Sequence, residues 1–234
     1  MAVLSPQARM RAKIEDIFKE GESSLQKLVA DKKLMAHVGI DWQRLYCDPD
    51  FEANPHRCKN CVTIQQALGL MRATINELRP LMPSLWITHD IKIRDRYLDD
   101  DNEAFNLEGN DLNRKLDALR IQSQQMCLPV HAGEPVIPKL HHCGFEGTTL
   151  HQQLQEKQIE VVMLSGVLRS VCVKKSGLTA KFLGYDTYIA EDLTADETQY
   201  PLAHYARDLM ERAEKGLKMV RIQNALKILK GVQP

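Results

Sequence analysis

The chain has 234 residues, 44% hydrophobic and 26% charged, which is typical of one globular domain with a sizeable core. Lys plus Arg and Asp plus Glu both number 31, so no net charge favours nucleic acid or an anionic membrane surface. No apolar run approaches the roughly 20 residues of a membrane span, and residues 1–33 lack the apolar run of a secretion signal. We therefore expect a cytoplasmic protein without nucleic-acid or membrane partners. Its six cysteines would be free thiols, metal ligands or a nucleophile.

The first predicted element is a helix over residues 6–33, where apolar residues recur mostly at three- and four-residue steps. Residues 21–23 (Gly-Glu-Ser) are a candidate break. We interpret residues 1–34 as an N-terminal helical extension that packs on the domain or on a partner. The domain would begin with an apolar strand at 35–40, followed by a striped helix over 64–78.

Strands and helices alternate along the rest of the chain. The predicted elements are a strand at 84–89, a charged loop or lid at 94–110, a short helix at 112–119, an extended segment at 135–139, a helix at 149–157, a strand at 159–164, a helix at 172–183, a strand at 185–190 and a helical region at 201–234. This alternation predicts an α/β fold with three α/β/α layers and a mainly parallel, Rossmann-like sheet over residues 35–200. The region 201–234 would pack on the same domain.

The carboxyl ends of parallel strands are where such folds bind ligands, and two polar residues of interest follow predicted strands. Asp41 ends the first strand, and Cys172 follows the strand at 159–164. At the start of a helix, unpaired N–H groups would favour the thiolate of Cys172 and could bind an oxyanion. Position alone is equally consistent with a nucleophile and with a buried structural cysteine.

Two charged side chains, Asp41 and Lys139, are candidate partners of this thiol. Alone, Asp41 could cap a helix or pair in a loop, and Lys139 could be a surface lysine. Together, however, an acid, an ammonium and a thiol at strand ends are what acyl transfer through a thiol requires. The sequence therefore predicts that Asp41, Lys139 and Cys172 meet in one site.

Three blocks of sequence carry a family resemblance. They are Val38-Gly39-Ile40-Asp41-Trp42-Gln43, then Pro135 to Lys139 with Phe145-Glu146-Gly147-Thr148-Thr149-Leu150, and finally Ser165 to Val173 with Gly184 to Asp192. In order and spacing, these blocks resemble the isochorismatase-like cysteine hydrolase superfamily over roughly residues 35–196. The resemblance implies a homo-oligomeric hydrolase that acts on a small molecule.

The resemblance also implies roles for individual residues. Cys172 would be the nucleophile, Asp41 the base that takes its proton, and Lys139 the cation that stabilises the pair. It further implies a cis peptide bond between Val167 and Leu168, which would direct the Leu168 N–H, with that of Cys172, at an oxyanion.

The sequence departs from the family in two places. Nicotinamidases of the superfamily carry Asp-x-His where this chain has Asp90-Ile91-Lys92, and a lysine ammonium repels a metal ion. We therefore expect no catalytic metal and no cofactor, with Asp90 lining the substrate pocket. Arg169 stands where the family often has threonine, and would either face a substrate carboxylate or contact another subunit.

Several other residues have two possible interpretations each, one functional and one structural. Trp42 and Phe145 are residues that would ordinarily pack in the core and are also candidates for a pocket wall. Cys47, His56, Cys58 and Cys61 could form a structural zinc site or an unpaired surface loop. The adjacent His141 and His142 are interpreted as pocket-rim or loop residues.

The resulting hypothesis is a cysteine hydrolase that cleaves an amide or other C–N bond through a thioester. One alternative is vinyl ether hydrolysis of the isochorismate type, which should tolerate loss of the thiol but not of Asp41. A second alternative is a non-catalytic interaction protein on the same fold. The sequence does not identify the substrate.

Overall fold

The computed structural model describes residues 5–51, 62–90, 109–197 and 200–232, which form an α/β fold around one sheet. Six strands follow the order β3-β2-β1-β4-β5-β6, and every neighbouring pair is parallel. The strands are β1 (Met35–Ile40), β2 (Ser84–His89), β3 (Val136–Lys139), β4 (Val161–Val167), β5 (Asp186–Ala195) and β6 (Lys218–Val220). The predicted α/β fold with a parallel sheet is confirmed.

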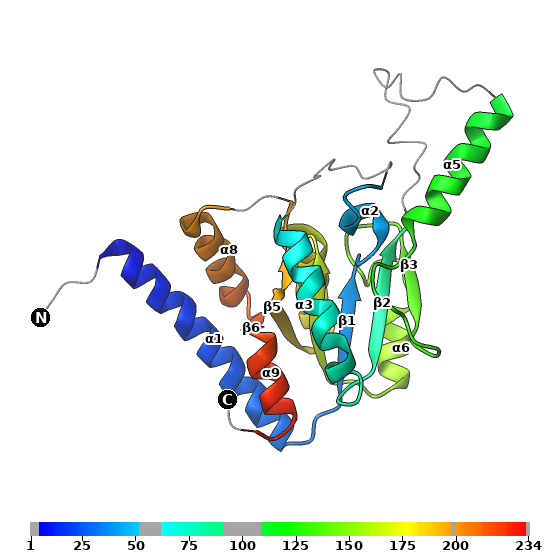
Figure 1. The fold of residues 1–234 in the computed structure, drawn as a ribbon. Coiled ribbons are helices and arrows are strands. Elements are labelled where there is room, and N and C mark those ends of the chain that lie inside the picture. The colour runs from blue at the N-terminus through cyan, green and yellow to red at the C-terminus, as the bar shows by residue number, and fades with distance from the viewer. Residues whose placement is uncertain (1–4, 52–61, 91–108, 198–199, 233–234) are drawn as a thin grey trace, which may run out of the picture.

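Helices flank the sheet (Figure 1). They are α1 (Pro6–Ala30), α2 (Arg44–Cys47), α3 (Val62–Leu78), α5 (Gly109–Ser123), α6 (Leu150–Glu156), the π-helix η1 (Arg169–Val173), α7 (Lys174–Phe182), α8 (Leu202–Glu214) and α9 (Ile222–Leu229). Helices α3 and α9 cover one face, whereas α6, α7 and α8 contribute to the core on the other. Helix α1 packs against β6, α8 and α9. None of the helices in the described residues is long and apolar enough to cross a membrane.

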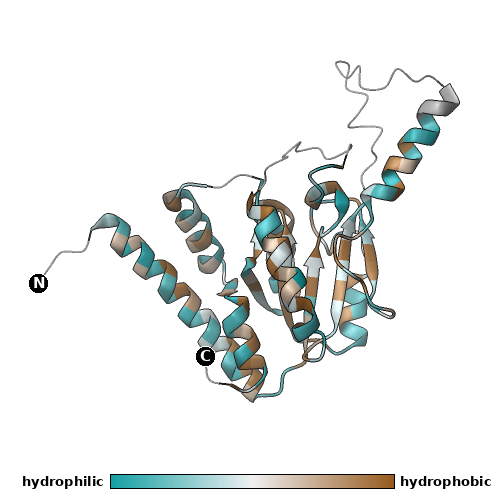
Figure 2. Ribbon diagram, viewed as in Figure 1, coloured by the Kyte–Doolittle hydropathy of each residue, from teal (hydrophilic) through white to brown (hydrophobic). Residues whose placement is uncertain are grey.

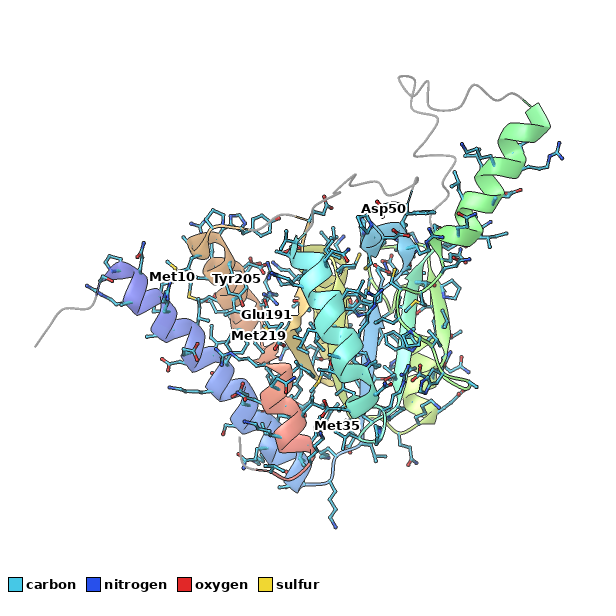
Figure 3. All side chains as sticks on the ribbon, in the orientation of Figure 1. Met10, Met35, Asp50, Glu191, Tyr205 and Met219 are labelled. Atoms are coloured by element: carbon cyan, nitrogen blue, oxygen red, sulfur yellow. The ribbon has the colours of Figure 1, made fainter. Side chains whose placement is uncertain are left out.

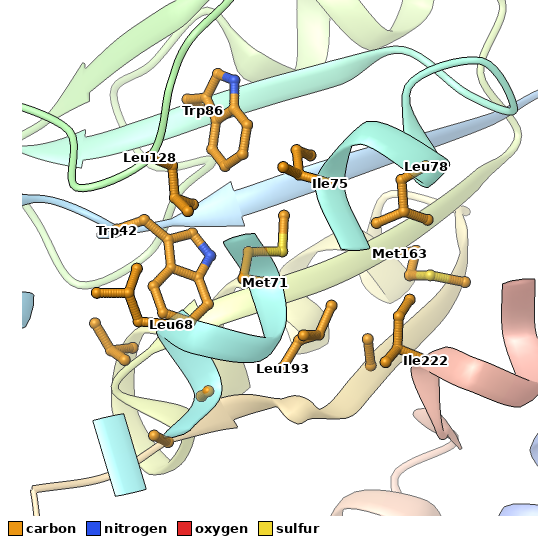
Figure 4. Packing of buried hydrophobic residues seen from close by; sticks show 14 of the residues in the cluster. Trp42, Leu68, Met71, Ile75, Leu78, Trp86, Leu128, Met163, Leu193 and Ile222 are labelled. Atoms are coloured by element: carbon orange, nitrogen blue, oxygen red, sulfur yellow. The ribbon is translucent and has the colours of Figure 1, made fainter. Parts of the chain in front are cut away.

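The central strands are buried on both faces, which explains their nearly continuous apolar sequences. Their side chains alternate between two core clusters: on β4, Met163 packs with the α3 side and Leu164 with the other side. Figure 2 shows apolar residues concentrated on the strands, and Figure 4 shows Met71 and Ile75 of α3 packing over the sheet.

The order of the strands creates a switch point between β1 and β4. From β1 the chain proceeds outward to β2 and β3, then returns to the other side of β1 with β4 and continues to β5 and β6. Ligands of open parallel sheets bind beyond the carboxyl ends of the strands at such a point. Asp41 directly follows β1, and η1 with Cys172 follows β4.

Most predicted elements are present, and three of the predictions need correction. The region 201–234 is not continuously helical, because α8 ends before Gly216, which has φ 80°, and the next residues pair with β5 as β6. Helix α1 continues through Gly21 without a break. Of the predicted loop 94–110, Gly109 and Asn110 begin α5, and the rest lies outside the described residues.

Candidate active site

Asp41 marks the point where the chain leaves β1. Its backbone adopts φ 57°, a left-handed conformation that aspartate tolerates better than most residues. Its N–H still donates to the Ile87 carbonyl at 2.8 Å, so the turn begins within the hydrogen bonding of the sheet. The carboxylate is completely buried. A charged group is therefore held inside the protein at the switch point.

The two residues after Asp41 fix this turn. Trp42 donates its indole N–H to Ser165 Oγ of β4 at 3.0 Å. The Gln43 amide binds the backbone of His89 at the end of β2, accepting from its N–H at 2.6 Å and donating to its carbonyl at 3.0 Å. The ends of β1, β2 and β4 are thus tied together around the carboxylate.

Lys139 reaches the site from the end of β3. Its side chain has no exposed surface, and Nζ lies 2.8 Å from Asp41 Oδ2. Nζ also lies 3.6 Å from Cys172 Sγ. Burying an ammonium is costly unless an opposite charge compensates it, so the ion pair with Asp41 explains why this lysine is buried.

Cys172 lies in η1, directly after β4, and is almost completely buried. Gly166 of β4 has φ 127°, and a Cβ there would lie 2.0 Å from the Ile40 carbonyl oxygen, so only glycine allows β1 and β4 to approach so closely. The peptide bond between Val167 and Leu168 is cis, as expected. The tight turn brings the thiol back over the end of β1.

The environment of the thiol raises its pKa to about 12. Burial is the largest cause, followed by the negative charge of Asp41, while Lys139 and the backbone N–H of Leu168 act in the opposite direction. The expectation that a helix start would favour the thiolate is therefore wrong. Cys172 is the fourth residue of η1, and burial beside a carboxylate outweighs the helix. The resting thiol is protonated at neutral pH.

Burial also raises the pKa of the Asp41 carboxyl, against the opposing effects of Lys139 and of the hydrogen bond from the thiol. A raised pKa makes this carboxylate a stronger base than an exposed aspartate. Acid, ammonium and thiol are thus in mutual contact, an arrangement that can move the thiol proton onto Asp41 while Lys139 stabilises the remaining negative charge.

Comparison with known proteins identifies the family of the chain. The family model described as the isochorismatase domain matches residues 35–220, which is most of the chain.

The chain belongs to the isochorismatase family.

Three solved structures that share this fold are distant in sequence. An isochorismatase family protein from Desulfovibrio vulgaris subsp. vulgaris str. Hildenborough is 15% identical, with a TM-score of 0.65 over 85% of this chain and 99% of that one. A pyrazinamidase of Pyrococcus horikoshii, in complex with zinc, is 18% identical, with a TM-score of 0.58 over 80% and 98%. N-carbamoylsarcosine amidase from Thermoplasma acidophilum is 20% identical, with a TM-score of 0.55 over 80% and 96%. These similarities support the fold.

Trp42 and Phe145, the two pocket-wall candidates of this isochorismatase-family chain, are both buried in core clusters. Trp42 has no exposed surface and packs in the cluster on the α3 side of the sheet (Figure 4). Phe145 packs in the opposite cluster, with its ring centroid 6.2 Å from that of Tyr185, which precedes β5. Both support the site by packing, and a contact with substrate stays a prediction.

Asp90 follows β2, and its carboxylate is held by α5. Arg120 donates to its two oxygens at 2.8 and 2.5 Å, and Gln124 donates at 2.7 Å. The hydrogen bond from Arg120 is the main cause of a lowered pKa at Asp90. Ile91 and Lys92 lie outside the described residues. The carboxylate is therefore already paired, and its role in lining a substrate pocket stays a prediction.

Arg169 lies in a cluster of charges. Its guanidinium lies 3.5 Å from Glu191 and 3.0 Å from Asp196, and it stacks over the Tyr205 ring. Figure 3 labels Glu191 on β5 and Tyr205 on α8, and Glu191 also forms a buried pair with Arg212 at 2.7 Å. Arg169 lines a cavity of about 510 Å³ formed with α3, β5 and α8, which none of Asp41, Lys139 and Cys172 reaches. Its charge is thus compensated within the protein.

The predicted zinc cluster falls largely outside the described residues, which do not include His56, Cys58 and Cys61. Cys47 is buried in α2, where its thiol donates to the Asp41 carbonyl at 3.7 Å and contacts the Cys127 thiol. Within the described ranges, no three His, Cys, Asp or Glu side chains are grouped so that they could hold a metal ion.

The structure also brings two histidines to the site: His142, which the sequence placed at a pocket rim or in a loop, and His89, which the sequence did not single out. The exposed His142 has Nδ1 3.8 Å from Cys172 Sγ, and its ring lies edge-on to that of His89 at 5.9 Å. His89 Nδ1 in turn hydrogen-bonds with the Tyr46 hydroxyl at 2.6 Å. The adjacent pair His141 and His142 shortly after Lys139 was the available signal, but the sequence could not show which of the two faces the thiol.

Proposed function

We propose that this protein is a cysteine-dependent hydrolase that cleaves an amide or other C–N bond of a small molecule through a thioester. The observation that carries the proposal is the contact among Asp41, Lys139 and Cys172 at the switch point of the sheet. Two of the distant structural relatives, the pyrazinamidase and the N-carbamoylsarcosine amidase, are named as amidases.

In the first half of the proposed reaction, Asp41 removes the proton of the Cys172 thiol. The raised pKa of the carboxyl favours this transfer, and Lys139, 3.6 Å from Sγ, stabilises the thiolate. The thiolate attacks the carbonyl carbon, and the C–N bond breaks as the amine takes the proton from Asp41. The products of this half-reaction are a thioester on Cys172 and a free amine or ammonia.

The developing oxyanion needs donors beside the thiol. The backbone N–H of Leu168 contacts Cys172, and we assign the oxyanion hole to this group together with the N–H of Cys172. Water then cleaves the thioester, releases the acid and restores the thiol.

A metal of the kind bound by the zinc-containing pyrazinamidase does not fit the described residues. Asp90, the residue that would begin the metal motif, already accepts hydrogen bonds from Arg120 and Gln124. The proposed steps therefore use only the side chains and backbone of the chain.

The test is a panel of small primary amides and N-carbamoyl compounds, assayed for ammonia release. We expect the Cys172→Ala variant to lose turnover by at least about 10³-fold while unfolding at the temperature of the parent protein. Cys127→Ala is the matched control, since it removes a partly buried thiol elsewhere and should retain turnover.

The outcomes separate the hypotheses. Full amide turnover by Cys172→Ala contradicts the thioester route. Hydrolysis of an isochorismate-type vinyl ether that survives Cys172→Ala but not Asp41→Asn indicates ether chemistry instead. Absence of turnover by the parent protein across both substrate classes favours a non-catalytic protein.

A further inference from the structure

The thiol of Cys172 has two chemically different sides. On its buried side are Asp41 and Lys139, neither with meaningful exposed surface. On its solvent side is His142, whose side chain is exposed and whose Nδ1 lies 3.8 Å from Sγ. A water molecule that approaches a thioester from solvent therefore approaches from the side of the imidazole.

The segment that carries His142 is fixed to α7, the helix that directly follows η1 and the thiol. The Cys143 thiol donates to Thr179 of α7 at 3.3 Å, and the Gly144 N–H donates to Ser176 at 2.8 Å. Ser176 donates in turn to the carbonyl of Cys172 at 2.7 Å. The segment that follows His142 and the backbone of Cys172 are thus linked through Ser176.

We propose that His142 is the general base of thioester hydrolysis, so that the two half-reactions use different proton acceptors. Its Nδ1 takes a proton from water as the oxygen forms a bond to the thioester carbon. When the C–S bond breaks, the thiolate leaves with the electron pair and the imidazolium returns the proton to Sγ. The thiol, the neutral histidine and a carboxylic acid result. This inference rests on the thioester route proposed above.

Asp41 is poorly placed for the same task. It is completely buried and is engaged by Lys139 at 2.8 Å, whereas His142 is exposed. Histidine is the side chain whose protonation ordinarily changes near neutral pH, and a positioned general base contributes about 10²–10⁴ in rate. Loss of His142 should therefore slow deacylation by about that factor and leave acylation largely unchanged.

The test uses p-nitrophenyl acetate as an acyl donor, with His142→Asn compared with His141→Asn. Both histidines are exposed and adjacent in the chain, but His142 is the one whose ring nitrogen lies 3.8 Å from the sulfur. We expect His142→Asn to retain the initial burst of p-nitrophenolate and to accumulate acetyl-enzyme, detected on Cys172 by intact-protein and peptide mass spectrometry. His141→Asn should turn over like the parent protein. In His142→Ala, added imidazole should restore deacylation.

Each result bears on one proposal. Deacylation at the parental rate in His142→Asn, or accumulation of acetyl-enzyme in His141→Asn as well, overturns the role of His142. Slow deacylation that imidazole does not restore in His142→Ala also overturns it, because a free base should replace a lost one at an exposed position. If the parent protein shows no burst that depends on Cys172, the thioester route itself fails.

Discussion

At the scale of single residues, Asp41 has two opposite effects on Cys172. Its negative charge helps to raise the pKa of the thiol to about 12, which suppresses the thiolate. In the proposed reaction, however, the same carboxylate is the base that produces the thiolate. Reactivity toward a simple alkylating reagent and turnover of substrate should therefore respond differently when Asp41 is replaced.

We predict that Asp41→Asn lowers the pH midpoint for alkylation of Cys172 by iodoacetamide and also lowers amide turnover by about 10²–10⁴-fold. The midpoint falls because the negative charge of Asp41 no longer disfavours the thiolate. The positive charge of Lys139, 3.6 Å from Sγ, still stabilises it. Below the midpoint the alkylation rate is proportional to the thiolate fraction, so rates from pH 6 to 10, followed by mass spectrometry of the Cys172 peptide, should be higher for Asp41→Asn than for the parent protein. An unchanged or higher midpoint would show that Asp41 does not act electrostatically on the thiol.

The sequence predicts the residues of this site better than their chemistry. Asp41, Lys139 and Cys172 could be selected because each follows a predicted strand, and the ends of parallel strands converge. The raised pKa of the thiol could not be predicted, because it depends on the depth of burial and on the distance to Asp41. The contact of His142 with sulfur depends on the path of a loop, which periodicity does not describe.

At the scale of elements, β1 is joined to its neighbours by a buried histidine. His37 Nε2 lies 2.8 Å from Ser165 Oγ on β4, and Nδ1 lies 3.3 Å from Ser84 Oγ on β2. Burial lowers the pKa of His37 from 6.5 to about 4. The folded protein therefore keeps this imidazole neutral in a pH range where the unfolded chain protonates it.

This difference predicts that acid destabilises the fold through His37. Between pH 6.5 and about pH 4 the unfolded state binds a proton that the folded state does not, so stability falls as the pH is lowered through this range. The loss attributable to His37 between pH 7 and pH 5 is about 2 kcal/mol. Urea denaturation of the parent and His37→Gln proteins at both pH values measures it. Equal pH dependence in the two proteins would refute the assignment.

The short elements of the fold could not be predicted from the sequence. The strand β6 spans only Lys218–Val220 and η1 only Arg169–Val173, so neither is long enough to show a period of its own. Partners elsewhere in the chain define β6, since Tyr188, Ile189 and Ala190 of β5 pair with it. Longer elements could be predicted, because β4 is a continuous apolar run and α3 has apolar residues at three- and four-residue steps.

At the scale of the whole molecule, the two ends of the chain close the β6 edge of the fold together. Helix α1 packs against β6, α8 and α9. Ser24 of α1 accepts a hydrogen bond from Tyr188 of β5 at 2.8 Å, and Arg221 pairs with Glu15 at 2.6 Å. The N-terminal extension therefore packs on the domain, one of the two arrangements considered from the sequence, and buries its own apolar side chains Phe18 and Leu25 there.

Two glycines inside helices test how closely α1 packs on this edge. In α1, a Cβ at Gly21 would lie 2.0 Å from the carbonyl oxygen of Met219 in β6, so the helix would have to move away from the strand. In α3, Gly69 is exposed, and a Cβ there would meet nothing within 4 Å. We predict that Gly21→Ala destabilises the protein by about 1–3 kcal/mol through overpacking. The same substitution at Gly69 should stabilise it by about 0.5–1 kcal/mol through helix propensity. Urea denaturation of both variants measures the two effects, and a stabilising Gly21→Ala would mean that α1 does not pack against the backbone of β6.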